Sequence, residues 1–167
     1  MSSEESLRAA LAALEAQASG VGSREARARR AAEVIRQAGR YRWVGLYDVT
    51  EDDIAVIAWS GPTPPNHPRF PRNQGLNGAA VSSRSSVVVQ DVSKDGRYLT
   101  TLNDTRGEMI MPVCDPTGMV IGTIDVESAV VDAFGVQDAV LLEQCAHALR
   151  PLWGARGEGR GPTSGGS

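Results

Sequence analysis

The sequence predicts an α+β fold in which an antiparallel sheet of about five or six strands is bracketed by helices at both ends of the chain. Apolar residues recur at helical spacing within residues 3–38 and again within 136–152. Residues 41–128 hold short runs rich in β-branched and aromatic side chains, separated by polar turns, which is typical of strands joined by hairpins. The terminal helices are expected to pack against each other, on one face of the sheet or at the seam of a dimer.

The length of 167 residues fits one domain, expected over residues 1–153 and followed by a disordered tail at 154–167, where Gly, Arg and Ser dominate. The acidic N-terminus does not resemble a secretion signal and no long apolar run occurs, so a cytoplasmic protein without membrane contact is expected. The net charge of −3 gives no general attraction to nucleic acid. Arginines that recur between positions 24 and 42 are interpreted as the solvated face of a helix, so nucleic-acid binding is not expected.

The helices are placed by their caps and breakers. The first is expected over residues 3–17, where leucines form a narrow stripe. Ser23 is a suitable N-cap for a second helix that reaches about residue 38 and stops at Gly39. The last helix is expected over residues 136–152, until Pro151 disturbs it.

The strands follow from composition and spacing. Residues 41–49 and 53–60 are expected to form an antiparallel hairpin. The stretch 61–78 holds five prolines, so no regular element is expected to run through it, and a loop of that length is usually functional or mobile. A short helix is expected at 77–83, and a short buried strand at 86–90.

The most sharply specified segment is a buried hairpin whose turn is Asp115-Pro116-Thr117-Gly118. Asp125 and Glu127 leave the same face of its second strand, because side chains alternate along a strand. A two-residue turn would pair Glu108 with Asp125 and place it on that face. A three-residue loop with a Gly bulge would place Glu108 opposite Val126, on the other face, and Pro116 followed by Gly118 favours this second register.

Two interpretations of these acids remain open. They bind a ligand's ammonium or hydroxyl groups by charge-assisted hydrogen bonds, or they are solvated strand ends with Arg106 as a surface partner. Joint desolvation would raise one carboxyl pKa and create a general acid or base, although no nucleophile is evident. His, thiol and acid residues do not have metal spacing and no phosphate-binding motif occurs, so neither a metal nor a cofactor is expected.

Several short strings occur in order and at suitable intervals. They are Trp43-Val44-Gly45-Leu46-Tyr47, Gly75-Leu76-Asn77-Gly78, Gln90-Asp91-Val92, Tyr98-Leu99, Thr105-Arg106-Gly107-Glu108 and Ile121-Gly122-Thr123-Ile124-Asp125-Val126-Glu127-Ser128. In these strings the chain resembles a GAF domain over roughly residues 24–152. The resemblance implies a GAF-like sheet with the N- and C-terminal helices on one face and a pocket built from a short helix and loops on the other.

Two branches of that family are similar to different parts of the chain. The stand-alone free methionine-(R)-sulfoxide reductases look similar in the Trp43 strand and in the three acids, but they place cysteines where this chain has His67, Asn77 and Thr101. That reaction needs a thiolate to attack sulfur and a second thiol to resolve the intermediate, so thiol-dependent reduction is not expected. Cys114 and Cys145 are interpreted as small buried hydrophobes. The ligand-sensing branch needs no cysteine.

The resemblance therefore implies a small-molecule-binding protein, either sensor or metabolite-binding, without thiol redox chemistry and with no assigned catalytic residue. The alternative is an enzyme that acts on an amino-acid-like substrate by a cysteine-independent route. The expected partners are a small polar metabolite and a second copy of the chain, joined through the terminal helices at Leu11 and Leu14. The candidate ligand-binding residues are Asp125, Glu127, Glu108, Trp43, Tyr47, Asn77, Tyr98, Thr101 and His67.

Overall fold

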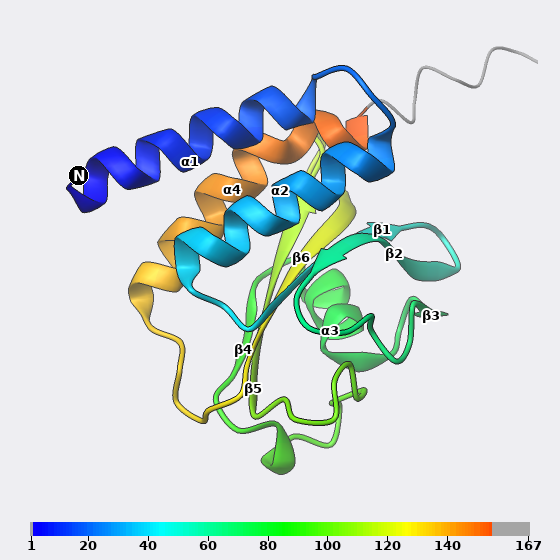
Figure 1. Ribbon diagram of the computed structural model, residues 1–167. Helices are drawn as coiled ribbons and strands as arrows, with labels where there is room; N and C mark the ends of the chain where they lie inside the picture. The colour runs from blue at the N-terminus through cyan, green and yellow to red at the C-terminus, as the bar shows by residue number, and fades with distance from the viewer. Residues whose placement is uncertain (1, 155–167) are drawn as a thin grey trace, which may run out of the picture.

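The computed structural model describes residues 2–154 and is built on one six-stranded antiparallel sheet (Figure 1). The strands in spatial order are β3 (Arg69–Pro71), β2 (Asp53–Ser60), β1 (Trp43–Val49), β6 (Val120–Ser128), β5 (Gly107–Cys114) and β4 (Val87–Val89). The helices are α1 (Ser3–Ala18), α2 (Arg24–Gly39), α3 (Gly75–Ser83) and α4 (Val136–Gly154), with a 3-10 turn at Val92–Lys94. The predicted fold class and strand number are confirmed. Apart from Gly154, the predicted disordered tail lies outside the described residues.

The main core lies between the sheet and a layer formed by α1, α2 and α4 (Figure 1). Val44, Ile124 and Val126 alternate onto this face and are fully buried beside Ile35 and Leu149. Helix α1 packs mainly on α2 and α4. The prediction that the terminal helices share one face is therefore confirmed, and α3 covers the opposite face with its own apolar cluster.

Two helix ends differ from the sequence prediction by a short distance. The Ser23 side chain accepts the Ala26 backbone N–H, as its N-cap position requires. Gly39 is the last helical residue of α2, and the left-handed residue that stops the helix is Arg40 rather than Gly39. A glycine is nevertheless needed at position 39, because a Cβ there would lie 2.0 Å from the Tyr41 ring. Helix α4 continues through Pro151 to Gly154. The Arg24 side chain, from α2, donates a hydrogen bond to its Leu152 carbonyl.

No regular element runs through residues 61–78, but the stretch holds more regular structure than was expected. The three-residue strand β3 pairs with β2, with Pro71 opposite Asp53, and α3 begins at Gly75. Because β3 is an edge strand, the missing N–H of a proline at its end removes no interior ladder bond. The rest of the stretch is tied to the pocket loops, since Asn66 donates its backbone N–H to the Thr101 carbonyl.

The favoured register of the central hairpin is also wrong, although its turn is right. Near the turn Cys114 lies opposite Val120, as in the predicted three-residue loop, and Gly118 takes a φ of +88°. One extra residue in β6 then shifts the register, so that Glu108 lies directly opposite Glu127 rather than Val126. The three-residue loop alone would place Glu108 on the face opposite Asp125 and Glu127. The extra residue in β6 shifts the pairing by one more position, so the three acids share a face.

The arginines between positions 24 and 42 mostly bind parts of the chain itself. Arg24 pairs with Asp48, Arg27 donates to the carbonyls that end α1, and Arg42 pairs with Asp104. Arg36 donates to the Ser60 hydroxyl. Most of these arginines therefore stabilise the fold through contacts within the chain. Within residues 2–154, none of the helices combines the length and the apolar character needed to cross a membrane.

Candidate functional site

Three acids meet beneath α3 on the face of the sheet opposite the helical layer. Glu108 on β5 lies across from Glu127 on β6, and Asp125 lies two residues before Glu127. The side chains are buried, with 2%, 0% and 0% exposure for Glu108, Asp125 and Glu127. One oxygen from each carboxyl group lies within 4.8 Å of the other two. The strand-end interpretation, in which these acids are solvated, is therefore wrong.

A polar neighbour on α3 forms a hydrogen bond with one of the three acids, Asp125. Asn77 on α3 donates its side-chain N–H to Asp125 Oδ2 at 3.0 Å, and its Oδ1 accepts the Thr123 hydroxyl at 2.6 Å. Among the described residues, Glu108 Oε2, Asp125 Oδ1 and both oxygens of Glu127 have no hydrogen-bond partner in good geometry, although the hydroxyls of Thr101 and Thr105 lie near enough to Glu127 to lower its pKa. Buried carboxyl oxygens without partners are energetically costly. The cluster is therefore built to receive a donor or a cation.

Burial raises the pKa of all three carboxyl groups. It raises the pKa of Asp125 to about 6, against hydrogen bonds from Glu108 and Asn77 that lower it. Burial, followed by the charges of Asp125 and Glu127, raises the pKa of Glu108 well above its usual range. Burial and the Asp125 charge do the same to the pKa of Glu127. Asp125 therefore ionises first, and the glutamates retain their protons longest.

Two aromatic side chains of β1 wall the cluster. Trp43 lies opposite Glu127 in the β1–β6 ladder, and Tyr47 lies opposite Thr123. Their ring centroids are 6.5 Å apart over Gly45, where a Cβ would approach the Trp43 ring to 2.3 Å. Glycine is needed at this position because the two rings close over the backbone opposite Asp125.

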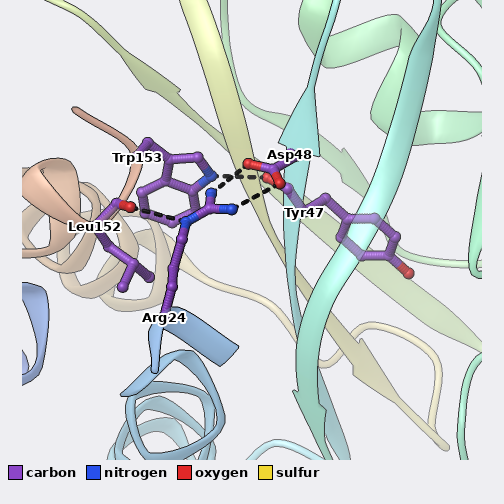
Figure 2. Close-up of polar contacts among 5 residues, drawn as sticks. All are labelled: Arg24, Tyr47, Asp48, Leu152 and Trp153. Atoms are coloured by element: carbon purple, nitrogen blue, oxygen red, sulfur yellow. Dashed lines mark hydrogen bonds and ion pairs between the residues drawn. The ribbon is translucent and has the colours of Figure 1, made fainter. Parts of the chain in front are cut away.

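The Tyr47 backbone is fixed from the opposite face of the sheet. Figure 2 shows the Tyr47 ring pointing away from Trp153, which approaches β1 from the end of α4. The Trp153 indole N–H donates to the Tyr47 carbonyl at 2.9 Å, and Arg24 joins Asp48 to the Leu152 carbonyl. The pocket strand is therefore anchored to the ends of two helices, which preorganises its aromatic wall.

A small cavity beside the cluster touches Glu108. It has a volume of about 10 Å³. Its lining includes the predicted residues Tyr47, Asn77, Thr101 and His67, together with Phe70, Gly75, Leu76 and Leu99. His67 is exposed, and Thr101 is buried beside the acids. The half-buried Tyr98 donates its hydroxyl to the Leu102 carbonyl, and the charge of Glu127 adds to burial in raising its pKa.

The structure thus gathers the nine predicted residues around one face, with His67 at the outer end. Sequence reasoning missed Thr123, Thr105 and the apolar Phe70 and Leu99. Strand alternation could have found Thr123, which precedes Asp125 by two positions. Thr105 lies in a loop and had no periodic signal, yet its hydroxyl is buried without a partner among the described residues.

Neither cysteine is placed to work with the acids. Cys145 lies in the core on the helical face, where burial raises the pKa of its thiol to about 12. Cys114 ends β5, six residues from Glu108, a separation of about 20 Å along an extended strand. Thiol chemistry at the acid cluster would require a cysteine that the pocket residues do not supply.

Comparisons with known proteins agree with this architecture. The GAF domain family model matches residues 23–150. GAF domain-containing protein A of Dictyostelium discoideum is 26% identical over 116 residues, or 69% of this chain and 72% of that protein. Free methionine-R-sulfoxide reductase of Saccharomyces cerevisiae is 24% identical over 110 residues, or 64% of this chain and 60% of its own length. The crystal structure of free methionine-R-sulfoxide reductase from Neisseria meningitidis in complex with its substrate superposes with a TM-score of 0.79 at 26% identity and covers 93% of each chain. The chain belongs to the GAF domain family.

Proposed function

We propose that this protein binds a small polar metabolite, and that a cationic group of the ligand, such as a primary ammonium, is received by Glu108, Asp125 and Glu127. The observation that supports this most directly is the set of unpaired, fully buried carboxyl oxygens on one face of the sheet. An ammonium can donate to three carboxylates at once, and such charge-assisted bonds are strong in a dry site.

The aromatic walls of the site suit a ligand that carries an apolar chain next to its ammonium group. Trp43 and Tyr47 supply aromatic surface and a cation–π contact for an ammonium. The cavity of about 10 Å³ is much smaller than a metabolite, so the ligand enters when the segment around Leu99 and Thr101 moves. A sensor or regulatory protein has this property, because ligand binding then changes the position of a loop.

Thermal-shift measurements with paired ligands test the proposal. Amino acids and other primary amines, including L-methionine and its sulfoxide, should raise the melting temperature, whereas their N-acetyl derivatives should not. Asp125→Asn should abolish the shift, and Glu51→Gln, in the exposed turn after β1, is the matched control. If the amines leave the melting temperature of the native chain unchanged, the proposal is wrong.

The alternative function is an enzyme that acts on an amino-acid-like substrate without thiols. Likeness to the Neisseria reductase that was solved with its substrate supports an amino-acid-sized ligand. The retained protons of Glu108 and Glu127 would then provide a general acid. Turnover that survives replacement of both cysteines and disappears in Asp125→Asn would favour this function over binding alone.

We extend the proposal to a cytoplasmic homodimer joined through α1 and α4. Val140 is 48% exposed and lies with Leu11 and Ala148 in a groove between these helices. Leu14 was predicted to form part of the dimer contact, but it is fully buried in the protomer's own core and cannot touch a second copy. The apolar groove with acidic and histidine neighbours supports a contact between copies.

A further inference from the structure

The three pocket acids form a donor set for a metal ion as well as for an organic cation. Their oxygens lie within 4.8 Å of one another, which allows all three to ligate one ion. This limit accommodates Ca²⁺, whose opposite ligands are about 4.6–5.2 Å apart, as well as the shorter spacing of about 4.0–4.2 Å around Mg²⁺. A purely oxygen donor set favours hard divalent cations over zinc or copper.

Thr105 gives independent evidence for a missing partner. Its hydroxyl comes from the loop before β5 and not from the acid-bearing strands, and its residue is only 7% exposed. Its Oγ1 has no hydrogen-bond partner among the described residues. The hydroxyl lies within hydrogen-bonding reach of Glu127, although not in good geometry, and lowers the pKa of that carboxyl group. A neutral oxygen next to Glu127 adds to the three carboxyl groups a mixed donor set of the kind that Ca²⁺ accepts.

The size of the cavity distinguishes an ion from a metabolite. The cavity lined by Tyr47, Thr101 and Glu108 touches one of the three acids and has a volume of about 10 Å³, which is about the room that one water molecule needs. An ion can occupy such a space with the loops where they are. An amino acid cannot do so until the loops move.

We propose that Glu108, Asp125, Glu127 and Thr105 bind a Ca²⁺-class divalent cation when no organic ligand is present. The inference rests on the proposed function, because the cation and the ligand's ammonium are alternative occupants of one subsite. The cation neutralises the buried carboxylates and holds the loops closed. Free divalent cation therefore competes with the amine and sets the ligand concentration at which the site opens.

Terbium luminescence with the full chain tests this proposal. Tb³⁺ is a Ca²⁺-sized probe, and Trp43, directly opposite Glu127, is the energy donor. Saturable emission that CaCl₂ reverses is expected, with weaker competition from MgCl₂. Glu127→Gln should reduce the Tb³⁺ affinity by at least about tenfold, and Thr105→Val by about tenfold, whereas Glu51→Gln, in the exposed turn after β1, should leave it unchanged.

The outcomes separate this inference from the proposed function. The absence of saturable emission, or equal emission from the native chain and Glu127→Gln, overturns the cation site. Thr105→Val keeps the test valid if Glu127→Gln does not fold, since it removes one hydroxyl and leaves the acids in place. If amines shift the melting temperature but Tb³⁺ and Ca²⁺ do not bind, only the cation proposal fails. If the cations bind and amines do not, the proposed function fails.

Discussion

The stability of this protein should fall as the pH rises from about 5 to about 8, because the buried acids hold protons more tightly in the folded state than in the unfolded chain. Asp125 has a pKa raised from 3.8 to about 6. Between these values the folded state binds more protons, so raising the pH disfavours it. The full difference corresponds to about 3 kcal/mol, of which about half is lost between pH 5 and pH 8. Glu108 and Glu127 shift in the same direction and add to the loss.

Urea unfolding, followed by tryptophan fluorescence at several pH values, measures this effect. Asp125→Asn should remove about 1.5 kcal/mol of the loss over that range, and should be more stable than the native chain at pH 8. Glu51→Gln, in the exposed turn after β1, is the control and should retain the native pH dependence. A free energy of unfolding that rises from pH 5 to pH 8, or that changes equally in the native chain and Asp125→Asn, would refute the reasoning.

Three further substitutions test the packing, the polar network and the assembly. Gly122→Ala places a methyl group 2.1 Å from Trp153 Nε1, so it should lower the free energy of unfolding by about 1–3 kcal/mol in urea; native stability would contradict that packing. Asn77→Leu removes the donor to Asp125, so it should cost about 1–3 kcal/mol and raise the carboxyl pKa further, as an NMR titration would show; an unchanged titration would argue against the hydrogen bond. Val140→Glu should halve the mass measured by light scattering at an unchanged melting temperature, and a native-like mass would reject the proposed dimer.

Local signals in the sequence were sufficient for the helices and for the hairpins. The Ser23 cap and the turn at Pro116 and Gly118 depend on short-range geometry, and both are observed. The register of β5 against β6 was missed because the extra residue in β6 has no turn residue to mark it. Strand β3 was missed because proline argues against strands in general, while edge strands tolerate it.

The site was predicted in part for a similar reason. Alternation placed Asp125 and Glu127 together, and resemblance to the family supplied Trp43, Tyr47 and Asn77. Burial of the acids could not be predicted, because it depends on α3 and on loops that close over the sheet from distant parts of the chain. Thr105 could not be assigned for the same reason, since its surroundings are set by tertiary packing.

Recognition of a positive charge by the buried acid cluster is the central claim, and calorimetry of one ligand pair tests it most directly. The primary amine that gives the largest thermal shift and its N-acetyl derivative would be titrated into the native chain in buffers of different ionisation heat. The amine should bind with release of protons from the cluster, the N-acetyl derivative should not bind, and Asp125→Asn should bind neither compound. Equal binding of the two compounds, or binding without proton release, would contradict it.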